Sequence, residues 1–288
     1  IAYVMTLKED KNKINSGLYI VSTPIGNLGD ITLRALEVLK KSDVILCEDT
    51  RVSKKLLSYY NINKRLISYH KFNEKKILQE VIQILKNNQI VSLISDAGTP
   101  SISDPGKVLV NACIKENILI VPIPGVSAIT AALSISGFSN EFYFHGFLSD
   151  TDNSIRKEFE LFNNLNCSIV FFISVQKLNK KFDLLKEAFP EREIIICREL
   201  TKLHETIYRG KISEFNKLQF ISKGEVTVII SEKKNSNKKD NLDESDKKKI
   251  KKLINTRSIK DIVRIFSKQK NISKSKIYNY CLEIKNEK

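Results

Sequence analysis

Short, β-branched apolar runs alternate with segments of helical periodicity between residues 18 and 138. Apolar side chains that recur at every third or fourth position, as at Ile77, Val81 and Leu85, predict a helix that packs on a core. Short runs such as residues 90–94 predict buried strands. Strands separated by helices form a mostly parallel sheet, which defines an α/β fold. Strands are expected at residues 18–21, 44–47, 66–69, 90–94 and 118–123, with helices at 31–42, from 53, at 74–86 and after 106.

A polar segment over residues 148–156 predicts a linker between a first domain at 17–147 and a second α/β domain at 148–232. Lys223 and Gly224 form a turn signal, and the short strands around it predict antiparallel pairing. In the second domain we expect strands at 168–173, 193–197, 206–209 and 225–231, and helices at 177–189 and 212–221.

The basic charge of the chain is concentrated at its C-terminal end. Residues 233–288 hold 18 Lys and Arg against 7 Asp and Glu, a net +11 of the total +15. Residues 233–249 have almost no apolar side chains and predict a charged linker, whereas 250–288 have helical periodicity. This helical basic region is either a helix-turn-helix-like module that binds nucleic acid or a small lysine-rich packing bundle.

Five scattered cysteines never adopt a CxxC spacing, which predicts reduced, mostly buried thiols in a cytoplasmic protein. The longest apolar stretch, 118–138, contains Pro122 and Pro124, so we expect no membrane span. His70, His145 and His204 lie far apart in the sequence, and no metal site is expected. The chain has no GxGxxG, no GxxxxGK[ST] and no nucleophile elbow, which removes the common nucleotide-binding and serine-hydrolase classes.

Four turns follow predicted strands, where an open α/β sheet binds its ligands. The most informative is SDAGTPSISDPG at 95–106, in which Gly98 allows a ligand to approach the backbone and the prolines stiffen the loop. Such a turn can also be a plain connector. The other three are STPIGNLGD at 22–30, CEDTR at 47–51 and PIPGVSA at 122–128.

The CEDTR turn places charged groups where the ligand crevice should lie. Charges at such a position are candidates for chemistry, although a salt bridge between Asp49 and Arg51 is a serious alternative. Ser127, in the PIPGVSA turn, can either cap the following helix or hold a ligand.

These four turns, in this order, together with RELTK at 198–202 and ETI at 205–207, resemble the ribosomal small-subunit RNA methyltransferase I family of the tetrapyrrole methylase superfamily. The resemblance implies two α/β domains with a cofactor cleft between them and a helical C-terminal region. It also implies S-adenosylmethionine as the methyl donor and the ribose 2′-hydroxyl of a cytidine in the decoding region of 16S rRNA as the acceptor. The implied partners are the small ribosomal subunit and a second copy of the chain in a homodimer.

The resemblance carries the cofactor contacts onto this chain residue by residue. It implies that Pro24 borders the cofactor and that the 95–106 loop lines its amino-acid and ribose end. Val126 departs from the proline usual in the family, and FISVQ at 172–176 departs from the Tyr-Glu-Ser-Pro-His pattern. The remaining implied contacts are Ala97, Gly98, Thr99 and Ile102, then Ser127 and Ala128, and from the second domain Ile173, Leu200 and Thr227.

A ribose hydroxyl is a poor nucleophile, so a carboxylate base is expected beside it. The candidates are Asp49, Glu48 and Glu199, in that order, and Arg51 is expected to bind phosphate or to orient Asp49. Two other functions remain open at this point, a small-molecule tetrapyrrole or corrinoid methylase and a non-enzymatic nucleic-acid-binding protein.

Overall fold

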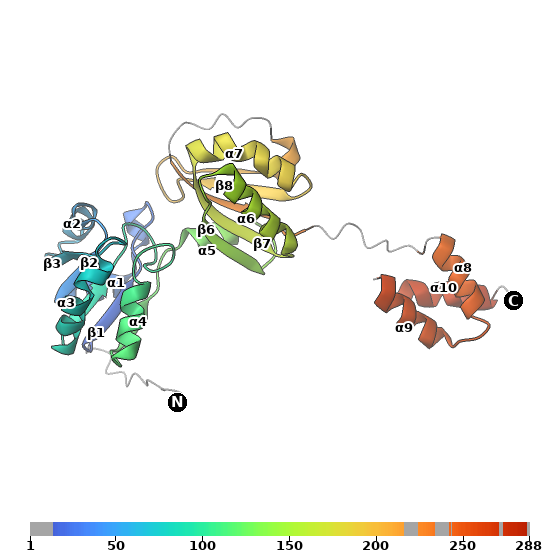
Figure 1. Ribbon diagram of the computed structural model, residues 1–288, viewed down its shortest axis with the longest axis horizontal. Coiled ribbons are helices and arrows are strands. Elements are labelled where there is room, and N and C mark those ends of the chain that lie inside the picture. Colours follow the sequence, from blue (N-terminus) through green and yellow to red (C-terminus); the bar gives the residue numbers. More distant parts are fainter. Residues whose placement is uncertain (1–13, 216–223, 234–241, 243, 271–272, 287–288) are drawn as a thin grey trace. The chain divides into compact units, whose positions relative to one another are not determined.

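The computed structural model describes residues 14–215, 224–233, 242, 244–270 and 273–286 of the 288. The chain divides into two compact units, Ile1–Glu232 and Lys233–Lys288 (Figure 1). Within the described residues the first unit contains two five-stranded sheets, and the second contains helices only.

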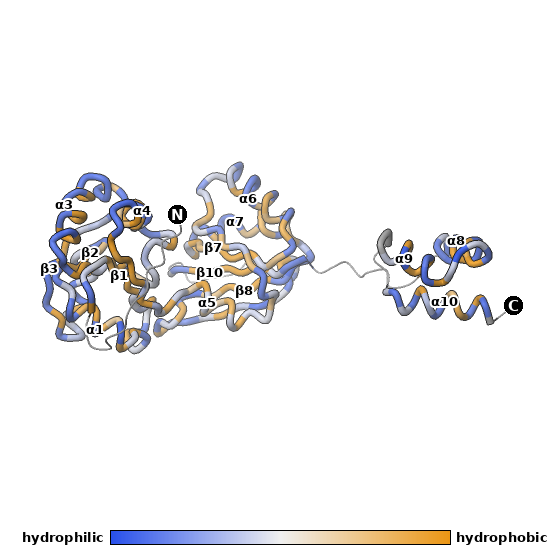
Figure 2. Tube along the Cα trace, turned by 90° about the horizontal axis from the view of Figure 1, so that it is seen from below, coloured by the Kyte–Doolittle hydropathy of each residue, from blue (hydrophilic) through white to orange (hydrophobic). Residues whose placement is uncertain are grey.

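The first sheet has the strand order β3-β2-β4-β1-β5, and all of its pairs are parallel, as the alternating pattern predicts. The three central strands, β1, β2 and β4, are almost entirely buried, which explains their mostly apolar sequences (Figure 2). The strands are β1 (Gly17–Val21), β2 (Val44–Cys47), β3 (Arg65–Ser68), β4 (Ile90–Leu93) and β5 (Ile120–Ile123).

Helices cover both faces of this sheet. α1 (Leu33–Lys41) and α2 (Thr50–Tyr59) pack on the face that carries Tyr19 and Ile45. α3 (Glu74–Lys86) and α4 (Lys107–Lys115) pack on the opposite face, which carries Leu18 and Leu46. Asparagines with positive φ follow three of these helices, because this side chain tolerates the left-handed conformation that ends a helix. They are Asn61 after α2, Asn88 after α3 and Asn117 after α4.

The second sheet has the order β6-β7-β10-β8-β9. Only the β6–β7 pair is parallel, so the expected antiparallel element is confirmed. Its core on one face is closed by α6 (Asp152–Asn164) and α7 (Val175–Ala188), and on the other by α5 (Ala128–Ser134). The strands are β6 (Phe142–Phe147), β7 (Ser168–Ser174), β8 (Glu193–Arg198), β9 (Thr206–Lys211) and β10 (Glu225–Ile230).

Three expectations differ from the structure in this half of the unit. β6 lies before the expected boundary at 147/148 yet pairs with β7, so the second sheet begins at Phe142. The expected linker 148–156 already contains the start of α6, because Thr151 accepts a hydrogen bond from the Ser154 N–H and caps the helix. The helix expected at 212–221 is only a 3-10 turn, Ile212–Glu214, and residues 216–221 lie outside the described residues.

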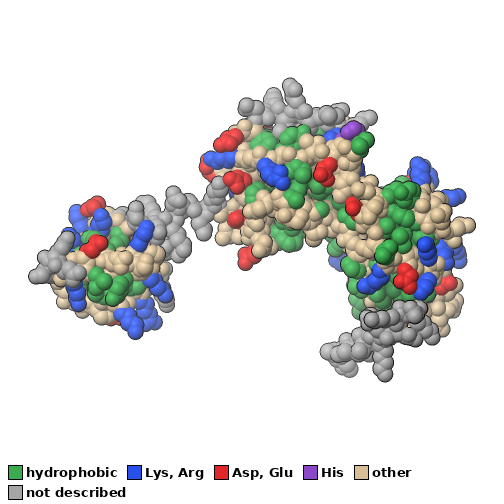
Figure 3. Space-filling model, turned by 180° about the vertical axis from the view of Figure 1, so that it is seen from behind, with side chains coloured by type: hydrophobic (Ala, Val, Ile, Leu, Met, Phe, Trp, Pro, Cys, Tyr) green, Lys and Arg blue, Asp and Glu red, His purple; other side chains and the backbone are tan. Residues whose placement is uncertain are grey.

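The C-terminal unit consists of α8 (Glu244–Leu253), α9 (Ile259–Lys270) and α10 (Lys274–Asn286) around a small apolar core that includes Ile250 and Phe266. Because α8 begins at Glu244, helix replaces the second part of the linker expected at 233–249. On the face of this unit that Figure 3 shows, lysine and arginine side chains lie around an apolar surface patch. Ser258 caps α9 by accepting a hydrogen bond from the Asp261 N–H at 3.2 Å.

Of the five free cysteines, Cys167 alone is partly exposed and the other four are buried, as expected. Among the described residues no helix is both long and apolar enough to cross a membrane.

Candidate active site

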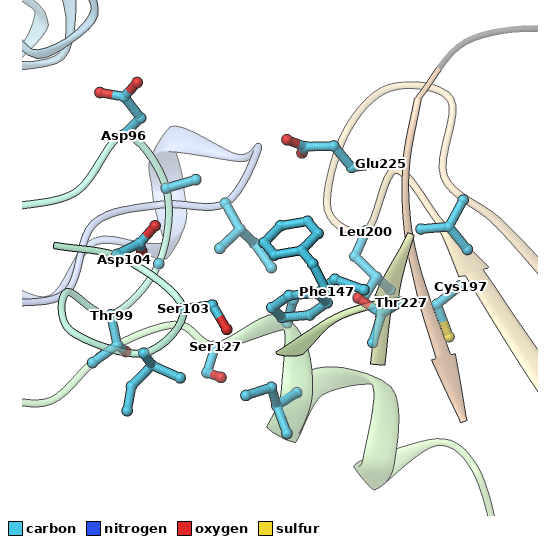
Figure 4. A pocket seen from close by; sticks show the side chains of 18 of the residues that line it. Asp96, Thr99, Ser103, Asp104, Ser127, Phe147, Cys197, Leu200, Glu225 and Thr227 are labelled. Carbon is cyan, nitrogen blue, oxygen red and sulfur yellow. The ribbon is translucent and has the colours of Figure 1, made fainter. Parts of the chain in front are cut away.

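A cavity of ≈360 Å³ lies within the first unit, between the loops at the carboxyl ends of the first sheet and the end of the second sheet (Figure 4). Every residue expected to hold the cofactor lines this cavity except Pro24, which is buried beside it. The two halves are joined nearby by a hydrogen bond of 3.1 Å from the Asn27 N–H to Thr201 Oγ1. The lining residues from the expected set are Ala97, Gly98, Thr99, Ile102, Ser127, Ala128, Ile173, Leu200 and Thr227.

The 95–106 loop is held in a fixed shape by the loop that follows β1. Thr23 and Gly98 exchange two backbone hydrogen bonds, of 2.9 and 3.0 Å. Ser22 Oγ lies 2.9 Å from Thr99 Oγ1. Gly98 has φ +79, a backbone conformation that residues other than glycine adopt only with strain. The backbone at Gly98 is therefore both open to a ligand and rigid.

Among the residues that the structure describes, four other than glycine and asparagine also have positive φ, and all four belong to the two loops that border the cavity. Ser101 (φ 69) and Ser103 (φ 63) lie in the 95–106 loop, and Glu199 (φ 51) and Thr201 (φ 65) follow β8. A left-handed conformation costs such residues about 1–2 kcal/mol each. Strain of this kind collects where a loop must keep a particular shape for a ligand.

Three carboxyl groups border the first-sheet side of the cavity, and the pKa of each is raised. Burial, followed by the charges of Glu48 and Asp96, raises the pKa of Asp104 to about 6 against an opposing hydrogen bond from Ser95. Burial and the charge of Asp96 raise the pKa of Glu48. Burial likewise raises the pKa of Asp96, whose Oδ1 accepts a hydrogen bond from the Asp49 N–H at 3.3 Å. Asp104 is thus a carboxyl group that titrates close to neutral pH.

Asp49 and Arg51 do not line the cavity, contrary to their expected catalytic roles. Asp49 is the N-cap of α2, and its carboxylate binds Arg51 through contacts of 3.1 Å to Nε and 2.6 Å to a terminal guanidinium nitrogen. The hydrogen bond from the Arg51 side chain lowers the pKa of Asp49 to about 2. The salt bridge that the sequence left as an alternative is therefore the arrangement observed.

Glu199 and Glu225 approach from the second sheet, with Lys202 between them. Glu199 Oε1 accepts hydrogen bonds from the Glu225 N–H at 2.8 Å and from Lys202 Nζ at 3.1 Å. Lys202 Nζ also lies 2.8 Å from Glu225 Oε2. Burial would raise the pKa of Glu199, but these hydrogen bonds outweigh it and lower that pKa. Glu199 is better placed to fix the loop than to accept a proton.

Two residues of the segment 172–176, which departs from the family pattern, form an apolar wall of the cavity. Ile173 is 3% exposed and lines the cavity beside Phe172, and Ser174 caps α7 by accepting a hydrogen bond from the Lys177 N–H. No group of three or more His, Cys, Asp or Glu is arranged to hold a metal ion in the part of the chain that the structure describes.

The lining residues that were not expected from the sequence include the acids Asp96 and Asp104 and the aromatic residues Phe147 and Phe172. The two aspartates lie inside the 95–106 motif, on either side of the segment Ala-Gly-Thr-Pro-Ser-Ile-Ser. Two carboxylates that flank a loop expected to bind a ligand are the sequence feature from which both acids could have been predicted. The two phenylalanines carry no such local signal.

The cavity suits a sulfonium cofactor. Glu48, Asp96 and Asp104 supply negative charge toward a cationic sulfur or ammonium group, and the glycine backbone at 98 leaves room for close approach. The family model of the Tetrapyrrole (Corrin/Porphyrin) Methylases matches residues 17–216, so the fold and the site define an S-adenosylmethionine-dependent methyltransferase.

Relatives refine this class. The chain is 42% identical over 231 residues to "Ribosomal RNA small subunit methyltransferase I" of Leptospira biflexa, covering 80% of this chain and 96% of the relative. It is 34% identical over 284 residues to the protein of that name from Neisseria meningitidis serogroup A, covering 97% of each. The chain belongs to the ribosomal RNA small subunit methyltransferase I family, within the tetrapyrrole methylases.

Solved structures share the fold. Uroporphyrin-III C-methyltransferase from Thermus thermophilus superposes with a TM-score of 0.54 at 18% identity, over 75% of this chain and 94% of that one. A cobalt precorrin-4 methyltransferase superposes with a TM-score of 0.55 at 18% identity, over 74% and 94% of the two chains. The predicted tetrapyrrole methylase fold, with its helical C-terminal region, is confirmed.

Proposed function

We propose that this enzyme methylates the ribose 2′-hydroxyl of a cytidine in the decoding region of small-subunit rRNA, with the small ribosomal subunit as its substrate. The observation that carries the proposal is the match to ribosomal RNA methyltransferases along nearly their whole length. We further propose that it acts in the cytoplasm as a homodimer, as the family resemblance implies.

In this proposal the cofactor is held by Ala97, Gly98, Thr99 and Ile102 on one side and by Leu200 and Thr227 on the other. Bound S-adenosylmethionine supplies a methyl group for an oxygen nucleophile. The chain orients the nucleophile, excludes water and accepts the proton that the hydroxyl loses. Positioning of this kind accounts for a large part of the rate in reactions that form no covalent enzyme intermediate.

The proton acceptor in this proposal is Asp104. A general base works best when its pKa is close to the operating pH, and the pKa of Asp104 is about 6. Burial, together with the negative charge of Glu48 and Asp96, keeps its pKa there. Glu48, a candidate base from the sequence, is the alternative, because it lines the same side of the cavity. Asp49, whose carboxylate is taken by Arg51, is not proposed as the base.

A small-molecule tetrapyrrole acceptor receives less support. The two solved tetrapyrrole methylases described above are each only 18% identical to this chain, which is a likeness of fold. The basic C-terminal unit favours a polyanionic substrate, since Lys and Arg that neutralise phosphates supply most of the sequence-independent affinity for RNA.

The test is tritiated methyl transfer from S-adenosylmethionine to small ribosomal subunits that lack 2′-O-methylation, with naked rRNA and a tetrapyrrole precursor in parallel. Nuclease digestion and mass spectrometry then locate the label. Label on a cytidine ribose of the decoding region is expected. Label on a base, on another ribose or on the tetrapyrrole would refute the proposed acceptor.

A further inference from the structure

We propose that the ring of Phe147 is a stacking platform for the target nucleobase, so that the acceptor nucleotide enters the cavity with its base turned out of the RNA stack. This inference rests on the proposed function and adds a subsite to it. Phe147 is 65% exposed although it lines the cavity, so its ring lies where the cavity opens. In Figure 4 it lies between Ser103 and Ser127 on one side and Leu200 and Thr227 on the other.

The ring of Phe147 rests on one side against the ring of Phe172, which is itself packed against a further aromatic ring. Its centroid lies 5.3 Å from that of Phe172, with a tilt of 59°. Phe172 in turn meets Phe144 edge-on at 5.1 Å. Phe144 and Phe172 are packed into the apolar cluster beneath α5. Phe147 therefore presents an anchored ring to the cavity, and a ligand that stacks on it does not have to immobilise a free side chain.

A β-bulge turns Phe147 toward this side of the sheet. Side chains three positions apart on a regular strand point to opposite faces. Here the register shifts between Phe144 and Gly146, which makes His145 an extra residue, so Phe144 opposes Val170 and Phe147 opposes Phe172. Val170 and Phe172 share one face of β7, and both phenylalanines of β6 therefore lie on it. Bulges commonly re-aim a side chain next to a functional site.

Gly146 makes this bulge compatible with the cofactor loop. It has φ +89, and a Cβ at this position would lie only 3.2 Å from Ser103 Oγ. The 95–106 loop consequently approaches the backbone of β6 one residue before Phe147. The ring is thus placed next to the loop that we assign to the cofactor.

The charge of the cavity restricts which part of an RNA can enter it. Phosphodiesters would be repelled by the acidic lining, whereas a ribose and its base are uncharged. The only basic residue among the described lining residues is Lys202, and it is paired with Glu199 and Glu225. The carboxylates of the lining are Glu48, Asp96, Asp104, Glu199 and Glu225.

A neutral nucleoside brings one strong recognition element for an apolar wall, the π-face of its base. Enzymes that act on a nucleotide within a structured nucleic acid commonly extrude it and stack the base on aromatic side chains. Phe147 is the exposed ring that meets this requirement, and the apolar Ile173 continues the wall behind it. A ring tolerates any base, so Phe147 supplies affinity and orientation, and the choice of cytidine must come from elsewhere.

The experiment compares the full-length wild type with Phe147→Ala, Phe147→Leu and Phe147→Trp. Methyl transfer to unmethylated small ribosomal subunits gives kcat/KM for the subunit, and calorimetry gives the affinity for S-adenosylmethionine. Phe142→Ala is the matched control, because Phe142 is an exposed phenylalanine of the same strand that does not line the cavity.

We expect Phe147→Ala to lower kcat/KM for the subunit by about 5- to 150-fold, the range found when one base is deprived of its aromatic partner. Phe147→Leu should be nearly as impaired, because it keeps apolar bulk without a π-face, and Phe147→Trp should stay close to wild type. Affinity for S-adenosylmethionine should stay within about twofold in all variants, a margin small beside the effect expected from one stacked base. Phe142→Ala should behave as the wild type.

Two results would overturn the inference while the proposed function stands. Either Phe147→Ala keeps its kcat/KM for the subunit, or it weakens binding of S-adenosylmethionine by the same factor, which would make Phe147 a cofactor contact. A wild type that labels no ribosomal RNA would instead refute the proposed function, and the inference would fall with it.

Discussion

Replacing Asp104 with asparagine tests the proposed base most directly, because the amide keeps the size of the side chain and removes its ability to accept a proton. General-base catalysis contributes about 10²- to 10⁴-fold to a rate, so kcat should fall by a factor in this range. Affinity for S-adenosylmethionine should change far less, because several other residues line the cofactor site.

The pH dependence supplies the second part of this prediction. A base with a pKa of about 6 is mostly ionised at pH 7 and mostly protonated at pH 5. Initial rates with both substrates below their KM report the free enzyme, and they should fall about tenfold from pH 7 to pH 5. Asp104→Asn should lose this limb of the profile.

Stability distinguishes a missing base from a damaged fold. The pKa of Asp104 is raised in the folded state, so its ionised form destabilises the fold at pH values above that pKa and not below about 4. Asp104 is partly exposed, so the discounted effect is about 1 kcal/mol. At pH 7.5 Asp104→Asn should therefore unfold at the same urea concentration as the wild type or a higher one.

Asp49→Asn is the matched control, because it also removes a carboxylate at a strand end but one held outside the cavity by Arg51. Asparagine is a good N-cap, so α2 should persist. This variant should keep both the rate and the pH profile. A flat profile between pH 5 and 7 in the wild type, or an Asp104→Asn variant with undiminished kcat, would refute the reasoning.

Three further predictions concern packing and the C-terminal unit. Phe162→Ala should lower the free energy of unfolding by about 3–5 kcal/mol in urea titrations, because the fully buried ring of Phe162 packs against four other aromatic rings. A decrease below about 1 kcal/mol would contradict this packing. Gly106→Ala should lower the free energy of unfolding by about 2 kcal/mol or more, because a Cβ would clash with Ser101 at a backbone φ of +143. An unchanged urea midpoint would show that the loop adjusts freely. Deleting residues 233–288 should weaken RNA binding without affecting the affinity for S-adenosylmethionine. The slope of log affinity against log salt concentration should become shallower by about 0.7 for each phosphate that this unit neutralises. An unchanged slope would show that this unit does not contact the RNA.

The first sheet could be predicted because its pattern is local. All four residues of β2 are buried, so the run from Val44 to Cys47 is apolar throughout, and helices with clear periodicity separate it from its neighbours. β6 could not be assigned in this way. Its Phe-Tyr-Phe-His-Gly-Phe sequence contains a bulge, and its membership in the second sheet depends on pairing with β7 across α6.

The site could be predicted in part, for the same reason. Glycine and proline in the segment around Gly98 predict a turn, and this turn does line the cavity. Asp49 shows the limit, because its strand-end position was visible but the direction of its carboxylate was set by capping α2 and by Arg51. The pKa of Asp104 is raised first by burial and then by Glu48, which is remote in sequence, so no local pattern reports it.

The left-handed residues around the cavity have a consequence for engineering and evolution. Glycine at Ser101 or Thr201 would relieve backbone strain, and a screen for heat resistance alone would favour such replacements. Each would also free a loop whose present rigidity spares the ligand an ordering entropy. Thermostable variants selected without an activity assay should therefore accumulate changes at these positions and lose cofactor affinity. In these two loops, greater stability would be gained at the expense of turnover.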